Sequence, residues 1–225
     1  MNRILPEKAP AEVPDDINNS LNKSNLAKRR FLDSMEMDYE KWHDGTGYDL
    51  TALGEMTQVD RDDITDILIA NQSDPWRNCE ALQHINTPRA LAAVKTALIH
   101  PSLEVRIAAS RFANSDDLER ERILTEALEK SDFYGGLTQA LDQVESFHTP
   151  GIIDALLRGL LKRSNSVAVN FAGMLFYIHG KAVSSFDWSH RPFFLRFSTD
   201  DHKQRRQAFI ELCSMIGVDP HQYIE

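Results

Sequence analysis

A stretch that occurs twice in the sequence constrains the fold more than any other feature. Residues 87–98 read TPRALAAVKTAL, and residues 149–160, at an offset of 62, read TPGIIDALLRGL. The segments VRIAAS at 105–110 and VAVNFA at 167–172 share that offset. Two independent matches at one spacing indicate an internal repeat, and such chains fold as stacked copies of one small structural unit.

A weaker copy lies between these two and divides the offset in half. Residues 124–128 (LTEAL) match residues 94–98 (VKTAL) at an offset of 30. The unit is therefore about 31 residues long, a period typical of helical solenoids. Apolar residues recur at helical spacing, and no segment shows the alternation that is typical of strands. The sequence therefore predicts an all-α fold.

Prolines mark where helices begin. Three expected helices open with a residue that caps helices followed by proline, whose missing N–H costs no hydrogen bond at the first helical position. These pairs are Asp74-Pro75, Thr87-Pro88 and Thr149-Pro150. In the last of these helices apolar residues cover one broad side, and Asp154, Arg158 and Lys162 form the opposite side. This division is typical of a helix that lies between a core and water.

These patterns divide the chain into four parts. Residues 1–16 contain three prolines and few large apolar residues, so we expect an extended tail. Residues 17–73 are expected to form an N-terminal helical cap, and residues 74–179 the repeats. Residues 180–225 are expected to form an irregular loop rich in aromatic residues and a C-terminal capping helix. Caps cover the apolar ends of a stack of repeats.

An acidic cluster opens one helix of the N-terminal cap. Residues 57–60 (TQVD) resemble a capping box with aspartate in place of the usual glutamate or glutamine, and Asp62 and Asp63 follow Asp60. Because the helix dipole favours carboxylates in a first turn, we interpret the cluster as structural. A docking patch for a basic partner is the less favoured alternative.

Two segments carry features of a known repeat: residues 74–77 (DPWR) have an Asp-Pro opening, and residues 101–109 (PSLEVRIAA) have a proline followed by Val-Arg and small residues. In this they resemble HEAT repeats, and in particular the short HEAT-like repeats of bilin-lyase-type and many bacterial proteins. The resemblance covers about residues 74–179 and implies a right-handed α-solenoid of short helix pairs. Ala168 stands where the repeat has arginine. Such solenoids serve many functions, so the resemblance implies no single activity.

Composition narrows the class of protein. The 225 residues carry a formal net charge of −9, which disfavours nucleic-acid binding and suits a basic protein partner. The sequence has no apolar core of a signal peptide and no apolar run long enough to span a bilayer. We therefore expect a cytoplasmic protein without a membrane partner. Cys79 and Cys213 lie in apolar helical patterns and are expected to be buried free thiols.

We find no motif for metal binding, cofactor binding or catalysis, so we expect no metal, no cofactor and no catalytic residue. Two loops, Trp42-His43-Asp44 and Asp187-Trp188-Ser189-His190-Arg191, do place an aromatic residue beside a histidine and an aspartate. A general acid–base pair is one interpretation. The favoured interpretation is that tryptophan anchors each loop while aspartate and histidine bond to loop backbone groups.

The sequence favours a non-catalytic protein that binds another protein. Candidate contacts are the two aromatic loops, since Trp, Tyr and Arg dominate interface energies, and the charged stripes of the second helices. These residues are Trp42, His43, Asp44, Tyr48, Arg89, Lys95, Asp154, Arg158, Trp188, His190 and Arg191. The narrower hypothesis is an immunity or antitoxin-type inhibitor of a basic bacterial toxin or effector. One alternative is an enzyme or chromophore-handling module of the bilin-lyase type, with a deep pocket lined by Trp188, His190 and Trp42. A general scaffold is the other.

Overall fold

The computed structural model describes residues 15–36, 38–44, 46–71, 73–113, 117–163 and 165–224. All regular elements in these ranges are helices, so the predicted all-α class is confirmed. The chain divides into two compact units, Met1–Leu91 and Ala92–Glu225. The tail expected for residues 1–16 lies outside the described residues up to residue 14, and residues 15 and 16 already belong to a helix.

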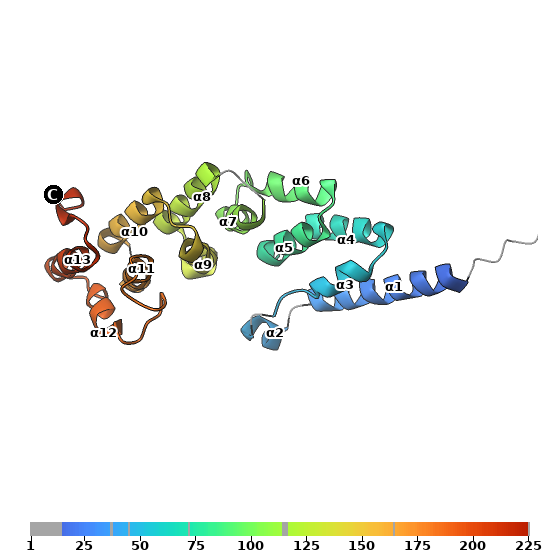
Figure 1. Ribbon diagram of the computed structural model, residues 1–225, viewed down its shortest axis with the longest axis horizontal. Helices are drawn as coiled ribbons and strands as arrows, with labels where there is room; N and C mark the ends of the chain where they lie inside the picture. Colours follow the sequence, from blue (N-terminus) through green and yellow to red (C-terminus); the bar gives the residue numbers. More distant parts are fainter. Residues whose placement is uncertain are drawn as a thin grey trace, which may run out of the picture. The chain divides into compact units, whose positions relative to one another are not determined.

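The first unit places a long helix against shorter ones. It contains α1 (Asp15–Met35), α2 (Tyr39–His43), α3 (Leu50–Glu55), α4 (Gln58–Ala70) and α5 (Pro75–Ile85), and α6 (Pro88–Ala97) crosses the boundary to the second unit. The short α3 lies along α1, and both α3 and α4 pack against α5 (Figure 1). Phe31, Ile64 and Leu68 are fully buried in the core of this unit.

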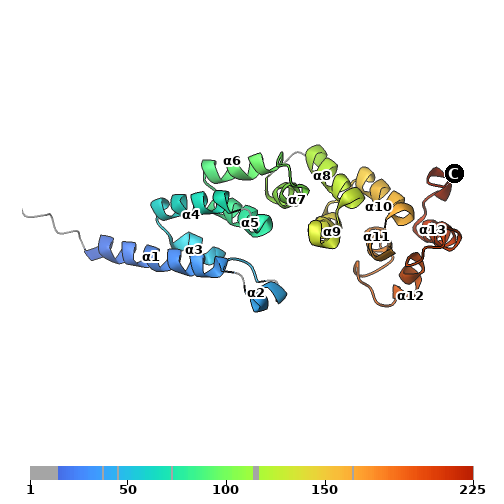
Figure 2. The same cartoon turned by 180° about the vertical axis from the view of Figure 1, so that it is seen from behind.

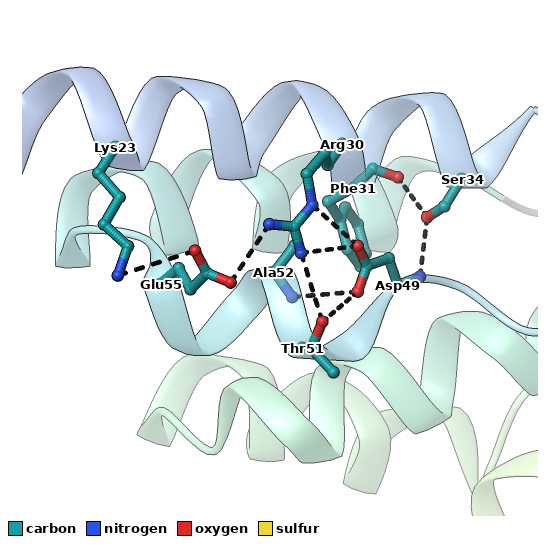
Figure 3. Close-up of polar contacts among 8 residues, drawn as sticks. All are labelled: Lys23, Arg30, Phe31, Ser34, Asp49, Thr51, Ala52 and Glu55. Atoms are coloured by element: carbon teal, nitrogen blue, oxygen red, sulfur yellow. Dashed lines mark hydrogen bonds and ion pairs between the residues drawn. The ribbon is translucent and has the colours of Figure 1, made fainter.

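An arginine of α1 holds α3 in place. Arg30 donates two hydrogen bonds to Asp49 Oδ2, at 3.2 Å from Nε and 2.9 Å from Nη2, and a third to Glu55 Oε1 at 3.2 Å (Figure 3). The other oxygen of Asp49 accepts the N–H of Ala52 and so caps α3, while the N–H of Asp49 donates to Ser34 Oγ at 2.9 Å. The carboxylate of Asp49 thus caps the start of α3 and binds α1.

The aspartates of α4 also bind α1. Thr57 Oγ1 accepts the N–H of Asp60 at 3.3 Å, but the N–H of Thr57 donates to Ser24 Oγ at 2.7 Å. The predicted capping box is therefore only half formed, because Ser24 of α1 takes over its second hydrogen bond and donates its own hydroxyl to Asp60. Lys28 Nζ lies 3.1 Å from Asp60 and 2.7 Å from Asp63. These two aspartates therefore have the structural role that the sequence favoured.

In the second unit, neighbouring helices pack in a regular sequence. The long helices are α7 (Leu103–Phe112), α8 (Asp117–Lys130), α9 (Leu137–Ser146), α10 (Pro150–Lys162), α11 (Asn165–Ile178) and α13 (His202–Ile216). Short elements are α12 (Arg191–Phe194) and the 3₁₀ helices η1 (Phe133–Gly135), η2 (Leu195–Phe197) and η3 (Pro220–Gln222). Helix α8 packs on α7, α9 and α10, and α11 packs on α9 and α10 (Figure 2). The expected C-terminal helix, α13, packs on α10, α11 and η2.

The repeated segments occupy matching positions in these helices. Thr87 Oγ1 accepts the N–H of Ala90 at 3.2 Å, and Thr149 Oγ1 accepts the N–H of Ile152 at 3.4 Å. Both Thr-Pro pairs therefore open a helix, α6 and α10, as predicted. VRIAAS lies in α7, VAVNFA lies in α11 and the weaker copy lies in α8. The period of about 31 residues thus corresponds to one pair of helices.

The region expected to be irregular, residues 180–199, contains more structure than the sequence predicted. The expectation is wrong for residues 191–197, which form α12 and η2. These turns are too short to be stable by themselves, and burial of Phe194 and Phe197 holds them against the rest of the unit.

A buried arginine joins three segments of the second unit. Arg205 of α13 donates hydrogen bonds to the main-chain oxygens of Arg163 at 2.9 Å, Phe197 at 3.2 Å and Thr199 at 2.8 Å. It therefore connects the C-terminal end of α10, the end of η2 and the turn that precedes α13.

Candidate functional site

The candidate residues near α2 do not form one surface. His43 and Asp44 are exposed and contact each other at 3.1 Å, while the side chain of Trp42 lies outside the described part of the chain. Tyr48 is buried, and its hydroxyl donates to Asn78 Oδ1 at 3.1 Å. Burial raises the pKa of Tyr48 to about 12. The prediction that Tyr48 contacts a partner is therefore wrong, because its ring packs edge-on against Phe31.

The charged stripes of the second helices are largely paired within the chain. Arg89 of α6 forms an ion pair with Asp66 of α4, and Lys95 is exposed. On α10, Arg158 Nε lies 2.7 Å from Asp154 Oδ2, and the guanidinium of Arg158 lies 5.6 Å from the ring centre of Tyr223. These side chains are accessible, but exposed ion pairs of this kind contribute little energy by themselves.

A broad depression of about 590 Å³ follows α8 and is lined mainly by charged residues. Glu126 in this depression lies 3.0 Å from Arg106, 3.7 Å from Arg122 and 3.5 Å from Lys130. Because the charges pair with one another across the helix surface, we do not place the functional site there.

The second aromatic loop is the most distinctive surface of the described residues. We call residues 180–198 the aromatic loop. Val183, Phe186 and Trp188 expose 89%, 67% and 73% of their surface, whereas the nearby Phe194 and Phe197 are buried. The interpretation that Trp188 anchors the loop is therefore wrong, since other phenylalanines fill the core. Exposed apolar side chains gathered on one segment are typical of interaction sites.

The loop is held against α11 and α9 by Ser185. Its main-chain oxygen lies so close to Gly173 of α11 that a Cβ on residue 173 would overlap it. The hydroxyl of Ser185 donates to Glu145 Oε1 of α9 at 2.5 Å, and the side chain is buried. The exposed apolar residues on either side of Ser185, Val183 before it and Phe186 and Trp188 after it, are therefore attached to a fixed point of the backbone.

Asp187 and His190 both make contacts within the second unit that shape the loop. Asp187 Oδ1 accepts the N–H of Ser189 at 2.9 Å and its hydroxyl at 2.6 Å, and these bonds hold the pKa of Asp187 below its ordinary value. Asp187 Oδ2 accepts the N–H of Val183 at 3.3 Å. The ring of His190 packs edge-on against Phe176 at a centroid distance of 5.4 Å. Both side chains therefore stabilise the conformation of the loop.

A groove opens beside the loop. It has a volume of about 290 Å³ and lies between the first turns of α11, residues 185–187 and the α12–η2 segment. Phe186, Phe194 and Leu195 supply apolar walls, and Arg191 lies at its edge. The guanidinium of Arg191 stacks over Trp188 at 4.5 Å from the ring centre. Aromatic, apolar and cationic groups thus converge on one accessible surface.

Among the described residues, no group of His, Cys, Asp and Glu side chains is arranged to hold a metal ion. None of the helices in the described ranges is long and apolar enough to cross a lipid bilayer. The chain matches no protein-family model, no curated protein and no solved structure.

Sequence reasoning found Trp188, His190 and Arg191 but missed the residues that position them. Glu145, Gly173 and Ser185 are far apart in the sequence and carry no motif. A glycine within the apolar helix 165–178 was the one available signal, because glycine costs helix stability unless a close approach requires it.

Proposed function

We propose that this protein is a non-catalytic α-solenoid of HEAT-like helix pairs that binds another protein through the aromatic loop. The proposed right-handed solenoid rests on the matched helix pairs and on the packing of α8 with α10 and α9 with α11. The non-catalytic character is supported by the structural roles of Asp187 and His190.

One observation carries the binding proposal: Phe186 and Trp188 are exposed on a loop whose backbone is fixed by Ser185. Burying exposed apolar surface stabilises a complex by about 25 cal/mol per Å² of apolar area. A loop that is already ordered loses little conformational entropy on binding, so more of this energy appears as affinity. Aromatic residues and arginine are also the side chains on which interface energies concentrate.

The narrower proposal is an immunity or antitoxin-type inhibitor of a bacterial toxin or effector, acting in the cytoplasm. The net charge of −9 supports it, because long-range attraction would accelerate association with a basic toxin. Arg89, Lys95, Asp154 and Arg158 are proposed as secondary contacts, together with His43 and Asp44. A general scaffold is the alternative, and it predicts partners on several faces.

Affinity capture from native lysate with mass spectrometry tests the proposal. The wild-type chain should retain a partner that the double variant Phe186→Ser/Trp188→Ser does not. Tyr134→Ser is the matched control, because Tyr134 is 97% exposed on η1, outside the loop. Co-expression with the captured protein then tests inhibition. Equal capture by all three proteins would reject the aromatic loop as the interface, and a captured toxin that stays active in the presence of this chain would reject inhibition.

A further inference from the structure

The aromatic loop has the opposite charge to the rest of the chain. Its 19 residues contain Lys181, Arg191 and Arg196 but only one acidic residue, Asp187. The loop therefore carries a formal charge of +2 within a chain of −9, which leaves −11 for all other residues. Glu211 of α13 and Glu145 of α9 contact the loop and offset part of this charge, so the exposed cations of the loop decide what a partner meets.

Lys181 and Arg191 are the cations of the loop that an incoming partner would meet. Both side chains are exposed, and the guanidinium of Arg191 lies over the ring of Trp188. Arg196 is already bound to Glu211, with Nη1 2.6 Å from the carboxylate. Asp187 also lines the groove, and its carboxylate already accepts hydrogen bonds from Ser189 and Val183 of the loop.

The groove beside the loop limits what can enter it. Its volume of about 290 Å³ lies just below the range of roughly 300–1,000 Å³ for small-molecule sites. It therefore suits one or two side chains better than a large cofactor. Val169, Phe186 and Leu195 make it apolar, while Ser166 and Ser198 at its lining can bond to a peptide backbone.

We propose that the aromatic loop and its groove bind an acidic peptide segment of the partner. An apolar side chain of that segment enters the groove beside Phe186 and Leu195, and a carboxylate next to it contacts Arg191, which lines the groove. A carboxylate farther along the segment contacts Lys181. The inference rests on the proposed protein-binding function and adds the chemistry of the segment that is bound. If the partner as a whole is basic, this segment is a local acidic exception on its surface.

Charge distinguishes a short segment from an extended anionic surface. A membrane or a nucleic acid would face the acidic remainder of the chain as well as the loop, and the remainder would repel it at low salt. A peptide of a few residues is short enough to contact the loop without approaching the acidic surface of the rest of the chain.

Selection from a displayed library of random peptides tests the inference on the full chain. Immobilised wild-type protein is used for selection, and Phe186→Ser/Trp188→Ser for counter-selection. Enriched peptides should contain a large apolar residue flanked by Asp or Glu. Replacement of that apolar residue by alanine, or Arg191→Glu in the protein, should each weaken binding by about tenfold or more. Arg206→Glu, an exposed charge reversal on α13, is the matched control and should change affinity less than Arg191→Glu.

Enrichment of basic or uncharged peptides would overturn the inference, and so would peptides that bind the counter-selection variant equally well. Failure to enrich any loop-dependent peptide would overturn it too. These outcomes are separable from the proposed function: a partner captured from lysate in a Trp188-dependent manner preserves that function even if the bound segment is not acidic. Vesicles of phosphatidylserine, sedimented with the protein, should not retain it; Trp188-dependent retention would favour a membrane surface and count against the peptide.

Discussion

The main-chain oxygen of Ser185 occupies the space that a side chain on Gly173 would need. Gly173 lies within α11, where alanine would otherwise be the better helix former by about 1 kcal/mol. Glycine at position 173 therefore allows the aromatic loop to approach α11 closely. A replacement that favours the helix but blocks this approach shows which of the two effects is larger.

We predict that Gly173→Ala destabilises the second unit by about 1–3 kcal/mol despite the gain in helix propensity, because the loop must move. Gly54→Ala is the control, since nothing lies within 4 Å of a Cβ built on Gly54 in α3, and it should be neutral or slightly stabilising. Urea unfolding of both variants checks the prediction. A Gly173→Ala protein as stable as wild type, with unchanged fluorescence of Trp188, would show that the position of the loop does not depend on the close approach of Ser185 to residue 173.

Arg205→Met is expected to destabilise the second unit by about 3 kcal/mol. The change leaves the carbonyl oxygens of Arg163, Phe197 and Thr199 without the charged donor that now joins them, and hydrogen bonds to charged groups are worth about 1.5–3 kcal/mol each. Its neighbour Arg206 is exposed, so Arg206→Met should stay within about 0.5 kcal/mol of wild type. Similar unfolding midpoints for the two variants would contradict the role given to Arg205.

The first unit should lose stability in acid. The hydroxyl of Thr51 and the guanidinium of Arg30 lower the pKa of Asp49, and the hydroxyl of Ser24 lowers the pKa of Asp60. A carboxyl whose pKa is lower in the folded state stabilises the fold above the unfolded pKa of about 3.9, and this stabilisation is lost as pH falls through the folded pKa. Stability should therefore be steady above about pH 5 and decline below about pH 4.

Urea unfolding of a Trp188→Phe protein measures this decline, because the remaining tryptophans, Trp42 and Trp76, lie in the first unit. The double variant Asp49→Asn/Asp60→Asn should show a flatter profile. Asp62→Asn should change the slope less, since the partner of Asp62 is the neutral amide of Gln58. A wild-type protein that becomes more stable on acidification would contradict the stabilising role of the ionised Asp49 and Asp60.

Each unit carries one buried thiol, and we predict that both react slowly in the native state. Burial raises the pKa of Cys79 to about 12 and that of Cys213 to about 11, so almost no thiolate forms near neutral pH. Ellman's reagent at pH 8 should label Cys79→Ala and Cys213→Ala proteins much more slowly than free cysteine, and rapidly in urea. Fast labelling in buffer alone would mean that the unit carrying that thiol opens readily.

Local patterns in the sequence predicted the helices well, because capping and periodicity are encoded by neighbouring residues. Thr87, Thr149 and the apolar stripes required no knowledge of distant contacts. Ser24 was beyond such reasoning, since its hydrogen bonds to Thr57 and Asp60 depend on how α1 packs on α4. The same is true of α12, whose turns depend on the burial of Phe194.

The candidate site was only partly predictable for the same reason. Composition singled out the loop that holds Trp188, but exposure depends on which aromatic residues the core accepts. Tyr48 is buried and Trp188 is exposed, although both belong to segments rich in aromatic residues. Side-chain type alone does not separate these outcomes, because both residues are large and amphipathic.

The two Thr-Pro helices differ at the residue that follows the Thr-Pro pair, which is Arg89 in one and Gly151 in the other. Arg89 pairs with Asp66 of α4, whereas the absent side chain of Gly151 leaves space for the carboxylate of Glu121 of α8. Each copy is thus fitted to an acidic residue two helices earlier. Exchanging α6–α7 with α10–α11 would leave Asp66 without its counterion, and the carboxylate of Glu121 would have to move to admit a side chain at the position of Gly151. The two copies therefore differ in how each accommodates its acidic neighbour, by an ion pair at Arg89 and by the absence of a side chain at Gly151.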